Sequence, residues 1–511
     1  MADYDVIIIG ANTPALVAAA YMGKLGGLKS LILEKSKWVG ATAMTIEMVP
    51  GYQFHPAATG EYYVDYTVEK ELELEKFGLV KIPANPMLTT TFGDGKYLSI
   101  YADVDATCDE IGKFSKKDAE AYKPFIQKWL RVGQFYGMAQ MNAPLPFSQF
   151  VASMSASPDL EELMRDMLFG SIKDILERTF ENDYVKAAFL TLSEGGNLGP
   201  SGAPFFFGVG RVLSPWGFVK GGLKSVGEVL EKAAIKNGAT IKREAEVSKI
   251  LVKDGKAYGV KLASGEEIIA NTIVSELELG KTFLDLVGPD HLPADFIRKV
   301  NEIIYECGGV TFNLALNSLP DFGFPEDRYR GFFGITPPGY DYFEEAFGQY
   351  HIGEIPNNIC SMTYLPSYIE PKVFAPEGKH VLTGYIFPIP YYLRKGNWET
   401  RKQELFDKWI EALARFSPNI KKLVTGCGGF SPLELEQKFS MTNGDLGHGT
   451  FRWINQLSFR PVVGWSQYRS PIQNLYMAGQ ATHPPSGVGG IGGINVARAV
   501  LEDLKKGKKG K

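Results

Sequence analysis

The chain contains 511 residues, of which 45% are hydrophobic and 22% are charged, and its formal net charge is −4. That length is too great for one compact core, so we expect two intertwined domains in an otherwise ordinary globular protein. The near-neutral charge offers no electrostatic basis for a nucleic-acid partner.

Neither the cysteines nor the histidines predict a metal site. The 4 cysteines lie far apart without a CxxC spacing, and the 6 histidines are equally scattered. Scattered cysteines favour a cytoplasmic protein over a disulfide framework. No uncharged apolar stretch reaches the length of about 20 residues that a membrane-spanning helix needs. Asp3 and Asp5 stand where a signal peptide requires positive charge.

The beginning of the chain has the pattern of a dinucleotide-binding βαβ unit. A β-branched run at residues 6–9 predicts a buried strand that ends at Gly10, and small and apolar residues at 14–22 predict a helix. A second strand is predicted at 29–33, and Glu34 follows it, 24 residues after the glycine. We expect the helix N-terminus to bind a pyrophosphate and the glutamate to accept hydrogen bonds from the adenosine ribose.

The glycine fingerprint of this unit is incomplete. It reads Gly10-Ala11-Asn12-Thr13-Pro14-Ala15, with asparagine and alanine in place of the second and third glycines. Alanine is an accepted third residue, and Asn12 is expected to tolerate a left-handed turn. Alone, the motif fits another doubly wound protein equally well. A second small-residue loop at 39–43 favours a bulkier cofactor than a nicotinamide one, with a plain surface turn as the alternative.

The end of the chain repeats the order of strand, glycine-rich turn and helix. Residues 474–480 predict a short strand, residues 482–493 the turn, and residues 494–504 the helix. Two remote helix N-termini suit a long cofactor, because one can hold the pyrophosphate and the other the negative charge near N1 of a reduced flavin. The pattern therefore predicts FAD and disfavours a plain NAD-dependent dehydrogenase, with a flexible glycine loop as the alternative.

Four segments of the chain resemble the phytoene desaturase-like FAD-dependent oxidoreductases. They are residues 5–20, 34–55, 216–274 and 470–501. Gly217 to Leu223 look like the family's glycine turn into a helix, and the strand at Val247 looks like the one that packs on the adenine. The chain departs from the family at Asn12 (usually glycine), at Gly40-Ala41 (usually two glycines) and at Ser275-Glu276-Leu277 (usually Asn-Ala-Asp).

The resemblance implies an α/β fold with non-covalent FAD. A Rossmann-like FAD-binding domain would be interrupted by an α+β substrate domain, as in the amine oxidase/phytoene desaturase fold. The FAD domain is expected at 1–80, 215–285 and 440–504, and the substrate domain at 81–214 and 286–439. Residues 505–511 are expected to form a basic disordered tail, and weak attachment of this tail to an anionic membrane surface is the alternative.

The resemblance also implies which residues contact the cofactor. Glu34 would bind the ribose, Val247 the adenine end, Gly479 the pyrophosphate or ribityl region, and Gly490 with Ile491 the pyrimidine edge of the flavin. The predicted cofactor-binding residues are Gly10, Ala11, Asn12, Thr13, Ala15, Glu34, Lys35, Gly40, Ala41, Thr42, Val247, Gly479, Gly490 and Ile491.

The stretches between these segments are rich in aromatic residues and methionine, which can line a pocket for an apolar ligand. Examples are residues 135–138, 205–207, 332–333 and 391–392, although most of them are individually expected to be core residues. We hypothesise that a substrate C–H passes hydride to flavin N5. The reaction would desaturate or dehydrogenate an isoprenoid, a carotenoid, or an alicyclic ketone or acid.

No catalytic residue is assigned from the sequence. His55 and His483 are candidates for polar roles because they adjoin the flavin-loop motifs, and His448 and Arg460 are weaker candidates. A flavin amine oxidase-like enzyme and a flavin-binding interaction protein without turnover stay as alternatives. The expected partner is an apolar small molecule, while the electron acceptor and the oligomeric state are not predicted.

Overall fold

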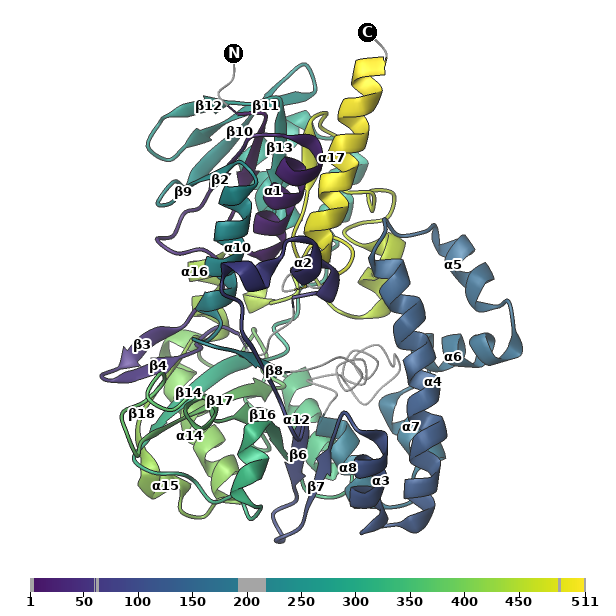
Figure 1. Cartoon of the computed structure of the whole chain (residues 1–511), viewed down its shortest axis with the longest axis vertical. Coiled ribbons are helices and arrows are strands. Elements are labelled where there is room, and N and C mark those ends of the chain that lie inside the picture. Colours follow the sequence, from purple (N-terminus) through teal and green to yellow (C-terminus); the bar gives the residue numbers. More distant parts are fainter. Residues whose placement is uncertain (1–3, 59, 61–63, 192–216, 486–488, 510–511) are drawn as a thin grey trace.

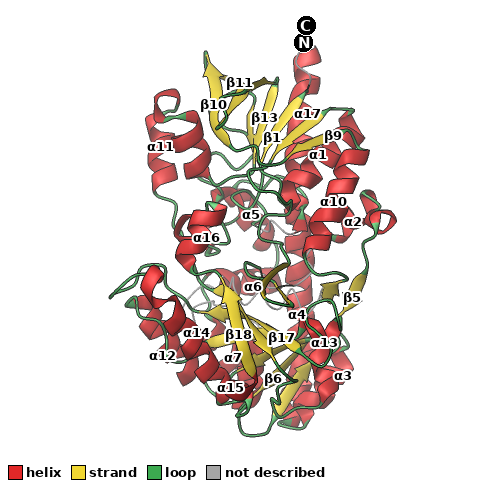
Figure 2. Cartoon of the chain, turned by 90° about the vertical axis from the view of Figure 1, so that its left-hand side faces the viewer, coloured by secondary structure: helices red, strands yellow, loops and turns green. Residues whose placement is uncertain are grey.

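The computed structural model describes residues 4–58, 60, 64–191, 217–485 and 489–509. The described chain forms two halves, each built around its own large sheet (Figure 1). Segments from the beginning, the middle and the end of the chain meet in one half, and the intervening segments build the other. Figure 2 shows the two sheets one above the other, with loops and short helices between them.

The first half contains a five-stranded sheet in the order β19-β13-β1-β2-β9, and all of its pairings are parallel. Its strands are β1 (Val6–Ile9), β2 (Ser30–Leu33), β9 (Ala239–Lys242), β13 (Thr272–Ser275) and β19 (Leu475–Met477). Val6 pairs with Ser30 on one side and with Thr272 on the other. The strand predicted at residues 6–9 is therefore a central strand, which explains its unbroken β-branched sequence.

Successive residues of β1 point to opposite faces of this sheet, as the pleat requires. Val6 and Ile8 pack with helices α1 (Thr13–Gly26), α10 (Lys224–Lys236) and α17 (Ile491–Lys509). Helix α17 lies close to α1 because Gly493 faces it, and a Cβ at Gly493 would collide with the carbonyl oxygen of Pro14. Small residues therefore bring the first and last helices of the chain together.

Ile7 and Ile9 face a second layer on the other side of the parallel sheet. The layer holds β10 (Val247–Lys253), β11 (Lys256–Leu262), β12 (Glu267–Ile269), η2 (Gly280–Val287), η3 (Pro289–His291) and α11 (Ala294–Asn301). Phe296 and Val300 of α11 belong to this hydrophobic cluster although they follow residue 285, where the FAD domain is expected to break. The domain boundaries stay predictions.

The second half is built on a seven-stranded sheet in the order β18-β14-β17-β16-β15-β6-β7. Its strands are β6 (Leu88–Thr91), β7 (Tyr97–Ile100), β14 (Val310–Leu316), β15 (Phe332–Ile335), β16 (Cys360–Tyr364), β17 (His380–Phe387) and β18 (Val424–Gly429). Only β6 and β15 pair in parallel among its described neighbours. On one face Phe312 stacks on Phe406 of α14 (Trp398–Ala414), with ring centroids 3.8 Å apart.

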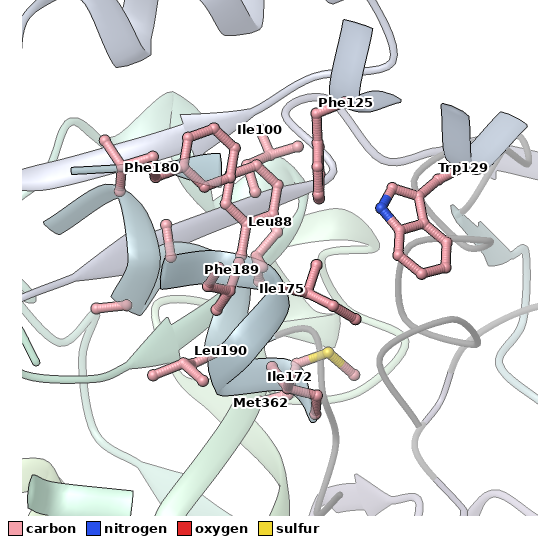
Figure 3. Packing of buried hydrophobic residues seen from close by; sticks show 14 of the residues in the cluster. Leu88, Ile100, Phe125, Trp129, Ile172, Ile175, Phe180, Phe189, Leu190 and Met362 are labelled. Carbon is pink, nitrogen blue, oxygen red and sulfur yellow. The ribbon is translucent and has the colours of Figure 1, made fainter. Parts of the chain in front are cut away.

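A group of helices adds a hydrophobic cluster next to this sheet, and Figure 3 shows part of its packing. The helices are α3 (Val104–Gly112), α4 (Lys116–Gln140), α5 (Phe147–Met154), α6 (Pro158–Leu168), α7 (Ile172–Thr179) and α8 (Asp183–Thr191). Phe180 and Phe189 stack at an interplanar angle of 2° with centroids 5.1 Å apart. The same cluster reaches Leu88 of β6 and Met362 of β16, which joins the helices to the sheet.

Shorter elements connect and cover the two halves. They are β3 (Ile46–Val49), β4 (Tyr52–Phe54), α2 (Tyr66–Glu71), η1 (Leu74–Phe77), β5 (Lys81–Pro83), β8 (Gly217–Val219), η4 (Glu326–Arg330), α12 (Asp341–His351), α13 (Pro366–Ile369), α15 (Ile420–Leu423), α16 (Pro432–Phe439), η5 (Thr442–Gly444), η6 (Trp453–Asn455) and η7 (Leu457–Phe459). Strands β5 and β8 pair where the chain passes between the halves. None of the helices in the described ranges is both long enough and apolar enough to cross a bilayer.

The end of the chain differs from the expectation. The tail predicted to be disordered from residue 505 is helical as far as Lys509, where α17 ends. An i,i+4 ion pair between Lys506 and Glu502, with 2.7 Å between Nζ and Oε1, lies on this last part of the helix. Because the pair is exposed, it adds little to helix stability.

Phe189→Ala is expected to lower the free energy of unfolding by about 3–5 kcal/mol, because it leaves a cavity between fully packed rings. Urea unfolding followed by far-UV circular dichroism measures the change. Phe169→Ala is the matched control, since that side chain is 71% exposed, and its effect should stay within about 0.5 kcal/mol. Equal effects of the two substitutions would contradict the assignment of Phe189 to a core.

Candidate functional site

A cavity of about 540 Å³ opens where β1, β2 and β13 end. Ligands of open parallel sheets bind at the carboxyl ends of the strands, and binding cavities commonly measure about 300–1,000 Å³. Gly10 follows β1, Glu34 follows β2 and Glu276 follows β13, and all three residues line the cavity. The position and size of the cavity are therefore those of a ligand site.

The structure brings together most of the residues predicted to bind a cofactor. Those that line the cavity are Gly10, Asn12, Thr13, Glu34, Lys35, Gly40, Ala41, Thr42 and Val247. Ala11 and Ala15 are fully buried behind the residues that line the cavity. Gly479 is not part of the lining among the described residues, but its neighbour Gln480 is.

Gly490 and Ile491 lie at the start of α17, outside the described lining of the cavity. Gly490 has a φ of +78°, and a Cβ there would come within 2.9 Å of the Cγ2 atom of Val17. The glycine therefore allows α17 to begin against α1. Residues 486–488, in the glycine-rich turn, lie outside the described residues. A contact of Gly490 and Ile491 with a flavin stays a prediction.

Asn12 does not adopt the left-handed conformation expected of it. Its backbone is extended, with φ −79° and ψ −179°, and Asn12 is the N-cap of α1. The side-chain Oδ1 accepts a hydrogen bond from the Ala15 N–H at 3.2 Å. Asparagine suits this position because the N-terminus of a helix needs a side-chain acceptor. The residues of these loops that have a positive φ are Gly10 (+94°) and Ala41 (+49°).

Glu34 is held in place by backbone donors. Its Oε2 accepts from the Ala11 N–H at 3.0 Å, and its Oε1 accepts from the Ser36 N–H at 2.8 Å. The two hydrogen bonds fix the carboxylate at the end of β2, where 8% of the residue is exposed. A pre-oriented carboxylate at the end of the second strand is the acceptor that ribose hydroxyls need in a dinucleotide site.

Glu276 is a buried carboxyl group among the polar residues that line the cavity. The Asn12 Nδ2 atom donates a hydrogen bond to its Oε2. Burial, followed by the nearby charge of Glu34, raises the pKa of Glu276 well above its usual value, and Lys35 acts in the opposite direction. Glu276 stood out in the sequence only as a departure from the family pattern, so its role in the cavity was not predicted.

Part of the cavity lining is apolar. It includes Trp38, Met44, Ile46, Met48, Phe430, Phe439 and Met441, and the polar residues Lys438 and Ser440 line the cavity among them. Ile46 and Met48 belong to β3, which contacts β18 of the seven-stranded sheet. The aromatic runs at 332–333 and 391–392 are not part of this lining, since Phe332 and Phe333 are core residues. The run at 205–207 lies outside the described residues.

Two further ionisable groups line the cavity. Burial raises the pKa of Glu278 to about 7, while Thr442 donates to its carboxyl from both the hydroxyl and, at 3.3 Å, the backbone N–H. Burial lowers the pKa of His448 to about 4, and Arg460 adds to this effect. The Nδ1 atom of His448 has no hydrogen-bond partner within the described chain.

Arg460 is fully buried and supports the loop that precedes α17. Its Nε and Nη2 atoms donate to the carbonyl oxygen of Gln480 at 3.0 and 2.7 Å, and Nη1 donates to that of Gly449 at 3.2 Å. The guanidinium therefore fixes backbone at the wall of the cavity rather than lining it. Its place among backbone carbonyls is that of a structural residue.

His55 lies in a separate, smaller pocket with Tyr364, Phe218 and Glu370. Its Nε2 accepts from the Leu223 N–H at 3.4 Å, so Nδ1 carries the proton and faces the Tyr364 hydroxyl. Burial lowers the pKa of His55 to about 3. Both ring nitrogens are thus engaged, which makes His55 a neutral bridge between segments.

His483 is fully buried, and its Nε2 lies 3.3 Å from the carbonyl oxygen of Ala139. Burial lowers its pKa to about 4. Neither His483 nor His55 lines the 540 Å³ cavity among the described residues, so a catalytic role for them stays a hypothesis. Within the same residues, no group of three or more His, Cys, Asp or Glu side chains could hold a metal ion.

Relatives of the chain are redox enzymes that match it from end to end. It is 29% identical to pyridine nucleotide-disulfide oxidoreductase domain-containing protein 2 of Rattus norvegicus, over 98% of this chain and 94% of that protein. A limonene dehydrogenase polypeptide of Castellaniella defragrans is 23% identical, over 98% and 95%. Phytoene desaturase of Neurospora crassa is 23% identical, over 95% and 82%. No family model matches the chain.

Solved structures share the fold. An oxidoreductase from Methanosarcina mazei superimposes with a TM-score of 0.60 at 15% identity, covering 97% of this chain and 99% of that one. Cyclohexylamine oxidase from Brevibacterium oxydans gives 0.56 at 17% identity, covering 98% and 100%. At these identities the likeness establishes the fold alone, and the predicted α/β, Rossmann-like fold class is confirmed.

The buried carboxyl of Glu278 makes stability depend on pH. The folded state keeps this proton up to about pH 7, while the unfolded chain loses it near pH 4.5, so the free energy of unfolding falls as pH rises between these values. The loss amounts to about 3 kcal/mol. Glu278→Gln is therefore expected to be more stable than the parent protein above neutral pH and about equal to it in acid.

Thermal or urea unfolding of both proteins across this pH range tests the expectation. The matched control is Glu228→Gln, because Glu228 is an exposed residue within α10 and lies away from the cavity. A stability gain that is the same at every pH would show that the substitution acts through packing and not through the proton.

Proposed function

We propose, because the chain is similar to the phytoene desaturase-like FAD-dependent oxidoreductases, that its cavity holds FAD and that it desaturates or dehydrogenates an apolar substrate. The relatives are oxidoreductases, which supports the predicted enzyme class, and the family that the chain resembles supports FAD as the cofactor. The residues that hold FAD and the substrate are proposals. One observation carries them, namely a single cavity at the carboxyl ends of the parallel strands whose lining combines charged and apolar side chains.

The polar residues of the lining near β1, β2 and β13 fit the adenosine and pyrophosphate parts of FAD. At the start of α1 the Thr13 N–H has no partner within the helix, while Pro14 has no N–H and the Ala15 N–H is used by Asn12. The Thr13 N–H and the helix dipole favour a phosphate there. Gly10 lets the backbone approach, since any Cβ there would meet Glu276. Glu34 would accept from the ribose hydroxyls, and Val247 would pack on the adenine. Gly479, Gly490 and Ile491 stay assigned to the ribityl and flavin parts, as the sequence predicts.

The apolar residues of the lining fit the flavin ring and a hydrocarbon substrate. When bound, FAD would supply the two-electron acceptor for the hydride that the substrate loses, and the proton lost with it would pass to solvent. The side chains of Met44, Met48, Phe430 and Met441 would exclude water from the reacting carbon and position it by contact alone. The substrate class that this lining supports is an isoprenoid, a carotenoid, or an alicyclic ketone or acid.

A flavin amine oxidase-like reaction is the second candidate function, and the fold shared with cyclohexylamine oxidase favours it. A flavin-binding interaction protein without turnover would have the same cavity but no substrate. The proposed partner is an apolar small molecule and not a nucleic acid. Weak association of the basic end of α17 with an anionic membrane surface belongs to the proposal as well.

FAD-loaded protein, titrated without oxygen with terpenoids, cyclic ketones and amines, tests the proposal. The apolar compounds are expected to bleach the visible bands of the oxidised flavin, and amines are not. Bleaching by amines alone would favour the amine oxidase, and no bleaching by any compound would favour the interaction protein. Protein that takes up no FAD would overturn the proposal itself.

Gly10→Ala is expected to weaken FAD binding at least about tenfold, because the methyl group displaces the carboxyl of Glu276 into the cavity. Fluorescence quenching of FAD measures the affinity. Gly255→Ala is the matched control, since Gly255 also has a positive φ (+72°) but open space around it. That control should lose stability from backbone strain and keep its FAD affinity. Equal affinities of the two variants would argue against the cavity as the cofactor site.

A further inference from the structure

Glu276 occupies a fixed place between two turns of the parallel sheet. Its backbone N–H donates to the carbonyl oxygen of Ile9 at 3.1 Å, which ties it to the end of β1. A Cβ on Gly10 or on Gly479 would collide with Glu276. Both flanking turns therefore need glycine because this glutamate fills the space between them, and 6% of the residue is exposed.

Asn12 fixes the direction of the carboxyl group. The Asn12 Oδ1 atom is already used by the Ala15 N–H of α1, so its Nδ2 must face Glu276. This amide can only donate, which makes the Glu276 Oε2 atom an acceptor. The Oε1 atom has no hydrogen-bond partner among the described residues, and the side chain lines the cavity. One carboxyl oxygen is thus saturated and the other is available to a ligand.

The surroundings of Glu276 oppose its ionisation. Burial raises its pKa most, and Glu34, a second carboxyl group at the end of β2, raises it further. Lys35 acts the other way, and Glu278 and Lys281 line the same cavity. A pyrophosphate at the start of α1 would bring further negative charge. A neutral carboxyl can donate a hydrogen bond to that group, whereas a carboxylate would repel it.

We propose that Glu276 carries a proton in the FAD complex and donates a hydrogen bond from Oε1 to the pyrophosphate, while Asn12 holds the carboxyl group in position. This inference rests on the proposed FAD site and adds that cofactor binding is coupled to a proton. Where the free protein has lost this proton, FAD affinity falls about tenfold for each unit of rising pH. The pair is therefore a binding element and not only a helix cap.

Infrared difference spectra of the FAD-loaded protein test the proton directly. The parent protein is expected to show the C=O band of a protonated carboxylic acid, which shifts in heavy water and is absent from Glu276→Gln. Glu278→Gln is the matched control, because Glu278 lines the same cavity and its loss should leave the Glu276 band in place. FAD-loaded parent protein without a band that depends on Glu276 would overturn the inference.

Fluorescence titration with FAD gives a second, independent readout. Glu276→Gln should bind FAD within about threefold of the parent protein near pH 6, since its amide also donates, and should not weaken in alkali. More than about tenfold loss in this variant at pH 6 would overturn the inference. If neither protein takes up FAD, the proposed function fails, whereas FAD bound without the proton removes only the role of Glu276.

Discussion

The close approach of α1 and α17 is the contact on which the site depends. Gly493 allows the last helix to lie against the first, and the small residues of α1 fill the remaining space without side-chain bulk. This contact places the turn after β1 and the turn after β19 on the same side of one parallel sheet. The cavity wall then follows from topology, because parallel strands present their carboxyl ends at a common edge.

Glu34, Glu276 and Arg460, which lie at or near the cavity, carry polar groups whose burial costs free energy. Glu34 is satisfied by two backbone N–H groups, and one carboxyl oxygen of Glu276 by the amide of Asn12. Arg460 is satisfied by backbone carbonyls, among them that of Gln480. Buried charges and polar groups persist when they are paired or neutralised, so each of these residues stiffens the backbone around the cavity.

Much of the parallel half could be predicted from the sequence, because its signals are local. Strand β1, helix α1, strand β2 and Glu34 follow from hydrophobic periodicity and the position of Gly10. The partnership of Asn12 with Glu276 could not be predicted, since it joins residues 264 positions apart. Asn12 was misread for the same reason, because a cap and a left-handed turn select the same amino acid.

The apolar residues that line the cavity could not be predicted from local sequence either. Phe430 lies between β18 and α16, Met441 lies between α16 and η5, and neither carries a periodic signal, whereas the conspicuous run Phe332-Phe333 is core. Aromatic content alone does not separate a pocket from a core, because both are apolar and the difference lies in which backbone segments face each other. His55 shows a similar limit, since its position beside a motif said nothing about its engaged ring nitrogens.

The strand order of the parallel sheet determines when its strands can pair during biosynthesis. Strand β1 is made first, but its two neighbours are residues 30–33 and 272–275, and the outer strand β19 follows only at 475–477. The N-terminal βαβ unit must therefore wait, with unpaired strand edges, until residues 239–275 have left the ribosome, and the outer edge of β13 must wait for residues 475–477. Contacts of such long sequence separation form slowly, and the cavity is completed after the last of these strands has been made.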